Sequence, residues 1–174
     1  MRLSWLSGTL LAVTPMIGCG SSFGPAPTAG PRAVVQEYCQ LDFDGGRLGA
    51  GEGERIFSFV TWEAEPGWDT AVIVSSFDVH EARQDGPRAQ VTVDYRVVGR
   101  FEGRPPTVLG EASERAEFRL IQRGNSWLID HGQIPPHASL PAFIAHLETL
   151  IQQARNDKRQ SALVRDLERL RALK

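Results

Sequence analysis

The chain has 174 residues and a formal charge of -2, from 19 lysine and arginine side chains against 21 aspartate and glutamate side chains. This length fits one ordinary domain with a real core plus an export signal, and is too short for two well-buried domains as well. Charged residues make up 23% of the chain and apolar residues 41%, which is typical of a soluble globular domain. Because no basic stripe or excess of positive charge is present, nothing predicts nucleic acid as a partner.

Residues 1–18 have the composition of a secretory signal. Arg2 supplies one early positive charge, a short apolar stretch runs from Leu3 to Ile17, and the small residue Gly18 precedes Cys19. These are the parts of a signal that is cut off on export. The stretch is interrupted by polar residues and a proline, and falls short of the roughly 20 apolar residues that a spanning helix needs.

The segment Met16-Ile17-Gly18-Cys19 resembles the lipobox of bacterial lipoproteins. This resemblance implies that Cys19 is acylated, becomes the first residue of the mature chain, and anchors it to a membrane of the cell envelope. Since no aspartate follows the cysteine, it also implies the periplasmic face of the outer membrane in a cell with two membranes. Met16 and Ile17 depart from the usual leucine and small residue. The alternatives are plain secretion with an incidental cysteine, or an apolar N-terminal helix of an intracellular protein.

The stretch that follows is predicted to be a flexible tether over residues 19–30, because it is rich in glycine, serine, proline and alanine and has no charge. If Cys19 carries lipid, Cys39 is the only thiol left, and the mature domain has no internal disulfide. We then expect Cys39 to behave as a small buried hydrophobic residue. A Cys19–Cys39 bridge is the alternative.

An N-terminal helix is predicted to begin at Pro31, because proline is favoured at the first helical position. Val34, Val35, Tyr38 and Leu41 recur at helical spacing, and residues 44–46 (Asp-Gly-Gly) end the helix. A short second helix is possible over residues 52–63, although its aromatic residues also fit a strand.

From residue 68 the apolar pattern changes to a period of two, and strands are predicted over residues 73–80, 91–101, 115–122 and 127–131. In the first strand, Ile73, Phe77 and Val79 are expected to share one face. The charged residues of the strands are expected on the face opposite the apolar ones. Pairing of opposite charges on this solvent-exposed face accounts for them without a catalytic role. These outward residues are Asp78, His80, Asp94, Arg96, Glu117 and Arg119.

The C-terminal section, residues 136–174, returns to helical spacing. Ser139 is predicted to cap one helix, and a second helix with a leucine row among charged residues follows Asn156. That second helix packs either on the parent domain or on a partner protein. The chain as a whole is predicted to be α+β, with the N-terminal helix packed on a curved antiparallel sheet and two extra C-terminal helices.

The order of a Tyr38-containing helix, long strands, and the motif Gly-x-x-Trp-x-Ile over residues 124–129 resembles the NTF2-like superfamily. The resemblance covers residues 31–135 and implies a cone, in which a curved sheet wraps around the N-terminal helix. The superfamily includes isomerases, dehydratases, transport factors and noncatalytic periplasmic modules, so the fold alone assigns no function. In its enzymes the cone interior holds an Asp or His base, often beside a Tyr.

The candidate ligand-binding residues are Tyr95 and His131, which fall in register with the apolar face, together with the aromatic residues Trp62 and Phe118. No catalytic residue is assigned. No cofactor is expected either, since residues 49–54 are glycine-rich but lack the lysine and hydroxyl residue of a phosphate loop. The four histidines show no metal-ligand spacing with cysteine, so no metal site is predicted.

These observations favour a noncatalytic, membrane-anchored envelope lipoprotein module that binds a protein partner or a small apolar ligand. The alternative is a small-molecule isomerase or dehydratase of the NTF2-like type that uses Tyr95 and His131. A third possibility is an envelope scaffold that binds a protein through its charged C-terminal helix.

Overall fold

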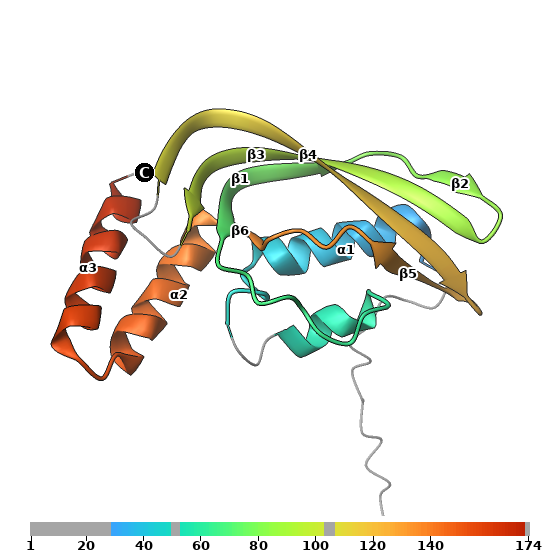
Figure 1. Cartoon of the computed structure of the whole chain (residues 1–174). Coiled ribbons are helices and arrows are strands. Elements are labelled where there is room, and N and C mark those ends of the chain that lie inside the picture. The colour runs from blue at the N-terminus through green and yellow to red at the C-terminus, as the bar shows by residue number, and fades with distance from the viewer. Residues whose placement is uncertain (1–28, 50–52, 103–106, 173–174) are drawn as a thin grey trace, which may run out of the picture.

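The computed structural model describes residues 29–49, 53–102 and 107–172 (Figure 1). The predicted signal, Cys19 and most of the predicted tether lie outside these residues. The described elements are, in chain order, α1 (Pro31–Phe43), the 3-10 helix η1 (Gly53–Ser58), β1 (Ala71–Val79), β2 (Arg83–Asp85), β3 (Arg88–Phe101), β4 (Thr107–Arg123), β5 (Ser126–His131), β6 (His137–Ser139), α2 (Leu140–Gln153) and α3 (Asp157–Arg171).

The strands form one six-stranded sheet in the order β5-β4-β3-β1-β6, with β2 paired to β3. The pairs β1–β3, β3–β4 and β4–β5 are antiparallel, whereas β6 runs parallel to β1 through three residue pairs. The α+β class is therefore confirmed, but the sheet is mixed, and the expectation of a purely antiparallel sheet is wrong at this edge. The sheet curls, and α1 lies within its curve (Figure 1).

Helix α1 buries one side against the sheet. Pro31 occupies the first helical turn, and the buried side contains Val34, Val35 and Tyr38. These residues share a core cluster with inward residues of β3 and β4, such as Phe118. The helix ends where the sequence predicts, because Gly45 adopts φ +92°, a left-handed conformation that favours glycine.

Strand β1 does not follow the simple alternation that its sequence predicts. The register with β3 shifts between Ile73 and Val74 and again between Val74 and Ser76, which changes the face of the sheet on which the side chains lie. Val74 packs in the core around α1, whereas Ile73 packs in a second core. Ile73 therefore does not share a face with Val79, because a bulge reverses the alternation of every residue beyond it.

The second core joins the other face of β1 to the C-terminal helices. Phe143 and Leu147 of α2 and Leu167 and Leu170 of α3 pack there with Ile73. The predicted Ser139 cap is confirmed, and Asn156 caps the second helix as well. The Ser139 hydroxyl accepts from the Ala142 backbone N–H and the Asn156 side chain accepts from the Arg159 backbone N–H, at the starts of α2 and α3. The leucine row of α3 thus packs on its own domain. None of the helices in the described part of the chain is long and apolar enough to cross a membrane.

Candidate functional site

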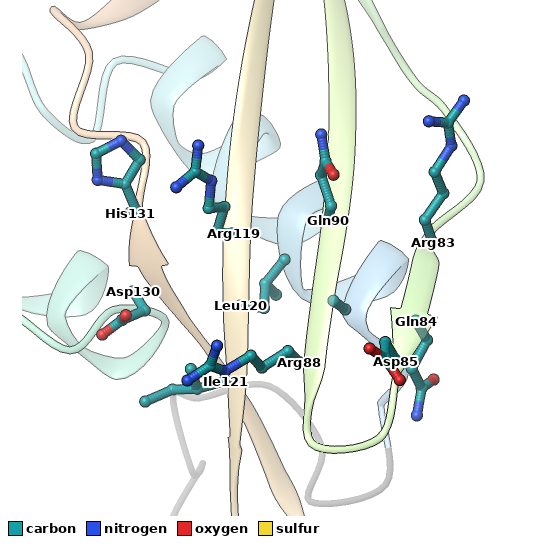
Figure 2. A pocket seen from close by; sticks show the side chains of 11 residues that line it. Arg83, Gln84, Asp85, Arg88, Gln90, Arg119, Leu120, Ile121, Asp130 and His131 are labelled. Carbon is teal, nitrogen blue, oxygen red and sulfur yellow. The ribbon is translucent and has the colours of Figure 1, made fainter.

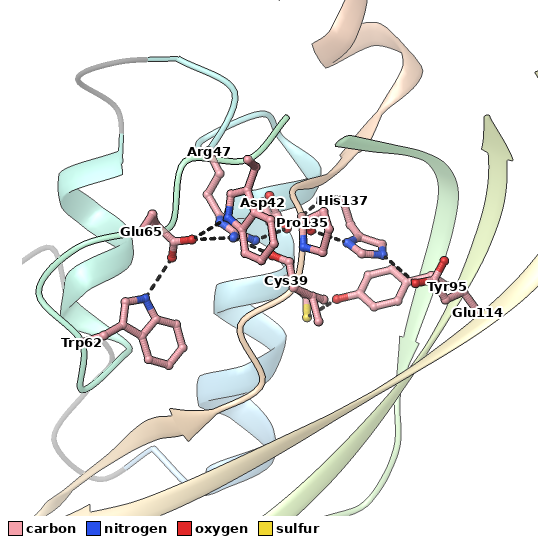
Figure 3. A network of polar contacts seen from close by, with 11 residues as sticks. Cys39, Asp42, Arg47, Trp62, Glu65, Tyr95, Glu114, Pro135 and His137 are labelled. Carbon is pink, nitrogen blue, oxygen red and sulfur yellow. Dashed lines mark hydrogen bonds and ion pairs between the residues drawn. The ribbon is translucent and has the colours of Figure 1, made fainter. Parts of the chain in front are cut away.

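A buried polar cluster lies between the C-terminal end of α1 and the inner face of the curled sheet (Figure 3). We define this polar cluster by its side chains: Tyr38, Cys39, Asp42, Arg47, Glu65, Tyr95, Glu114 and His137. They come from α1, from the segment between α1 and β1, and from β3, β4 and β6. Four regular elements and one irregular segment therefore converge on one polar centre.

Arg47 is the central cation of the polar cluster. Its Nη1 atom lies 3.1 Å from Asp42 Oδ2, and its Nη2 atom donates at 2.7 Å both to Glu65 Oε2 and to the Ile134 carbonyl. The side chains of Arg47 and Asp42 are only 2% and 1% exposed. Complete burial raises the pKa of Asp42, against the opposing charge of Arg47. Burial alone would lower the pKa of Arg47, but Asp42, Tyr38 and Glu65 together outweigh this effect and raise it.

Glu65 ties the segment before β1 to this cation. Its carboxylate accepts from the indole N–H of Trp62 at 3.0 Å and of Trp68 at 3.1 Å, in addition to Arg47. Burial alone would raise the pKa of Glu65, yet Arg47 and the two indoles lower it. The carboxylate stays ionised and holds both tryptophans in place.

His137 is fixed on three sides. Its backbone N–H donates to Asp42 Oδ2 at 2.9 Å, and its ring packs at a tilt against Tyr95, with the centroids 4.3 Å apart. The Nδ1 atom lies 2.7 Å from the Pro135 carbonyl, which can only accept, so Nδ1 carries the proton. In the neutral ring the lone pair is therefore on Nε2, which faces Glu114 Oε1 at 3.7 Å. Burial lowers the pKa of His137.

Tyr95 ends against α1, where its hydroxyl lies 3.2 Å from the Cys39 sulfur. Both side chains are 1% exposed. Burial raises the pKa of Tyr95 and raises that of Cys39 to about 12. The expectation that Cys39 is a buried free thiol is confirmed. Because these groups are enclosed, a substrate cannot reach the Tyr95 hydroxyl or the His137 ring in this structure.

The candidate ligand-binding residues of the sequence lie in different environments. Tyr95 and Phe118 are core residues, whereas Trp62 is partly buried and His131 is exposed. Trp62 and His131 line one shallow pocket of about 450 Å³. Tyr95 of β3 pairs with Glu114 of β4, whereas His131 of β5 pairs with Arg119, further along β4. The expected Tyr95–His131 pair is therefore not formed.

The inward orientation expected for His131 is wrong because of a bulge in β5. Leu120 pairs with Ile129, but the next residue of β4, Arg119, pairs with His131, which leaves Asp130 as an extra residue. An extra residue reverses the alternation beyond it. Ile129 consequently points into the core and His131 points out with Arg119.

The predicted cross-strand pairing of outward charges is confirmed at Asp94, whereas Glu117 and Arg119 pair along the same strand, β4. Arg115 holds Asp94 through two bonds of 2.6 and 2.7 Å, and His80 Nε2 lies 2.8 Å from the same carboxylate. The hydrogen bonds from Arg115 and His80 lower the pKa of Asp94. This cross-strand pairing is explained by the sheet alone.

A cleft of about 750 Å³ lies beside the polar cluster, between the segment before β1 and helix α2. Its polar lining residues are Arg47, Glu65, Asp69, Thr70 and His146. Most of its remaining wall is apolar or aromatic, from Leu48, Phe57, Trp68, Ala71, Phe101, Pro136, Phe143 and Leu147. Such a concave, mainly apolar site with a few fixed polar groups is the usual form of a small-molecule pocket.

Sequence reasoning missed the acidic and basic members of the polar cluster. Asp42 follows Tyr38 by four residues, so helical spacing places it on the buried side of α1. Glu114 precedes the inward Ala116 by two residues, but the predicted strand began at Arg115. Arg47 and Glu65 lie in irregular segments, where no periodicity indicates which side chains are buried.

Comparison with models of protein families, with curated proteins and with solved structures found no match for this chain. In residues 29–49, 53–102 and 107–172, no group of three or more histidine, cysteine, aspartate or glutamate side chains is arranged to hold a metal ion. The function is therefore inferred from the geometry of the polar cluster and of the cleft.

Proposed function

We propose that this chain is a noncatalytic binding module that holds a small, largely apolar ligand in the cleft between the segment before β1 and α2. The observation that carries the proposal is the aromatic wall of this cleft, which is fixed before any ligand arrives. Glu65 fastens Trp68 to the buried Arg47, and Arg47 is in turn bonded to the Ile134 carbonyl. A preformed wall lowers the ordering cost of binding.

The enclosed state of the inner polar groups supports a noncatalytic role over the isomerase or dehydratase alternative. A general base must come within hydrogen-bond reach of its substrate. Tyr95 and His137 are each 1% exposed, and His131 lies on the outer face. The two residues on which the enzyme alternative depended do not converge.

We also propose that the domain is an NTF2-like cone on a lipid anchor in the cell envelope. The curl of the sheet around α1 supports the cone (Figure 1). The lipobox-like residues 16–19 and the tether after them support the acylated Cys19. Covalent lipid contributes about 0.8 kcal/mol per buried CH₂, and more than one acyl chain is needed for stable anchoring.

Titration with N-phenyl-1-naphthylamine, an uncharged fluorescent probe, tests the cleft. Gly67 lines it, and a Cβ added there meets no atom within 4 Å, so Gly67→Leu adds bulk without a clash. We expect saturable binding by the native chain and at least tenfold weaker binding by Gly67→Leu. Ala33→Leu, which adds a side chain to the exposed surface of α1, is the matched control. Equal affinity in all three proteins would remove the cleft as the site.

Mass spectrometry of the protein from its native cell tests the anchor. The expected product begins at Cys19 and carries the added mass of acyl chains. A mature product that begins beyond Cys19, or a full-length chain without acylation, would contradict the anchored location while leaving the cleft proposal intact.

A further inference from the structure

Another concave site lies on the outer face of the sheet, opposite α1, where β2, β3, β4 and β5 meet (Figure 2). The groove has a volume of about 600 Å³ and is separate from the cleft beside α2. Its lining includes three arginines, Arg83, Arg88 and Arg119, against two aspartates, Asp85 and Asp130. The groove is thus locally cationic, in a chain whose formal charge is -2.

The strand register aligns four polar side chains in one row across this groove. Arg83 of β2 pairs with Gln90 of β3. Gln90 pairs with Arg119 of β4, which pairs with His131 of β5. Directly paired residues project from the same face of a sheet. Figure 2 shows these side chains at one level of the groove.

The bulge in β5 completes this row. Without the extra residue Asp130, the alternation of β5 would turn His131 toward the core, as the sequence alone predicts. Adjacent strands are about 4.8 Å apart, so Arg83 and Arg119 stand about 10 Å apart on either side of Gln90. Two long guanidinium side chains at that spacing can converge on one oxyanion between them.

The cations of the groove are not neutralised by its acids. Among the residues that the structure describes, neither Arg83 nor Arg88 has an ion-pair partner. Arg119 contacts Glu117 at 3.1 Å in a pair whose side chains are 65% and 45% exposed. Such an exposed pair is weak, contributing about 0–1 kcal/mol. Asp130 already accepts a hydrogen bond from the Thr61 hydroxyl at 3.0 Å.

We propose that the row Arg83–Gln90–Arg119–His131 binds a phosphate-bearing anion. Guanidinium groups bind phosphate oxygens through paired N–H donors, and Gln90 adds a neutral amide donor between them. The phosphate is either that of a soluble molecule or that of an anionic lipid headgroup. Both would present the same oxygens to the groove.

The test uses the full chain carrying Cys19→Ser, so that no acyl chain contributes to binding. One arm follows backbone NMR shifts during titration with inorganic phosphate, with sodium chloride of equal ionic strength as the reference. The other arm measures sedimentation with phosphatidylcholine vesicles that contain or lack phosphatidylglycerol. Arg83→Gln/Arg119→Gln is the test variant. Arg159→Gln/Arg165→Gln, which removes the same charge from the exposed face of α3, is its control.

We expect shifts at Gln90, Arg119 and His131, at least tenfold weaker binding by the groove variant, and a change below twofold in the control. Response to phosphate in solution identifies a soluble ligand, and response to the anionic vesicles alone identifies a headgroup; either supports the site. Equal losses in both double variants would show general charge attraction and overturn the proposal. So would the absence of binding in both arms.

Discussion

The Nε2 atom of His137 lies 3.7 Å from the Oε1 atom of Glu114, so a buried lone pair faces a carboxylate. The tautomer follows from the Pro135 carbonyl, which takes the Nδ1 proton. The buried ring nitrogen thus faces a second acceptor on a partly exposed side chain, and strands β6 and β4 bring the two residues together. An unsatisfied buried acceptor costs about 1–3 kcal/mol.

Replacing the acceptor by a donor should therefore stabilise the fold. In Glu114→Gln, the side-chain amide can donate to His137 Nε2 while its oxygen still accepts from Arg100, which now bonds Glu114 at 2.5 Å. We expect a gain of about 0.5–1.5 kcal/mol in urea denaturation at pH 7.5. Glu117→Gln, on the outer face, is the control and should change stability by less than about 0.5 kcal/mol. A loss of stability in Glu114→Gln would contradict this account of the His137 ring.

Stability should fall on acidification through His137. Burial lowers the pKa of this ring, so the folded chain binds the proton less readily than the unfolded chain, whose histidines titrate near about 6.5. The contribution of the neutral His137 ring to the free energy of unfolding is present above that pH. It is lost as the pH falls below it, at up to about 1.4 kcal/mol per pH unit. Urea midpoints between pH 7.5 and 5.5 measure this.

Two variants assign that pH dependence. His137→Gln should flatten it, whereas His131→Gln, which alters an exposed ring, should keep it. Asp42 titrates in all three proteins, so the difference between native chain and His137→Gln isolates the histidine. Parallel pH curves for these two proteins would rule out His137 as the titrating group.

Removing the buried cation should be far more costly than removing an exposed one. Arg47→Leu leaves Asp42 fully buried without its counter-charge, and we expect a loss of about 3–5 kcal/mol. Arg171→Leu breaks the pair with Glu148, in which both side chains are about half exposed, and should cost less than about 1 kcal/mol. Equal losses in urea denaturation would show that burial does not set the strength of the Arg47 interaction.

Gly132 should tolerate a side chain less well than Gly124, although both have positive φ. At Gly132, with φ +120°, a Cβ would lie 2.8 Å from the Phe118 ring and 2.9 Å from the Glu117 carbonyl. At Gly124, with φ +60°, it would meet nothing within 4 Å. We expect Gly124→Ala to cost about 1 kcal/mol from backbone strain. Gly132→Ala should cost a further 1–3 kcal/mol, roughly, from overpacking, as seen by thermal denaturation.

Tyr95 should affect stability and not ligand binding. Tyr95→Phe removes only the contact with the Cys39 sulfur, so we expect a loss of about 1 kcal/mol or less. Affinity for the naphthylamine probe should stay within twofold of the native value. Loss of probe binding in a variant that still unfolds cooperatively would return Tyr95 to the ligand-binding residues.

Local patterns in the sequence determined most of the elements. Pro31 and Gly45 set the ends of α1, and Ser139 and Asn156 set the starts of α2 and α3, because caps and glycine conformations depend on immediate neighbours. Alternation likewise determined the inner and outer faces of β3 and most of β4. These preferences act within a few residues, and so they can be read without the rest of the chain.

Only the tertiary structure decided where the alternation of inward and outward side chains is interrupted and which polar groups come into contact. Bulges in β1 and β5 place Ile73 and His131 on the faces opposite to those predicted. The sequence does not reveal them, because a bulge depends on pairing with a neighbouring strand. The polar cluster depends on contacts such as Asp42 with His137, 95 residues apart in sequence. No local period specifies such a contact, because it arises only when the sheet has curled around α1 and water has been excluded from between them.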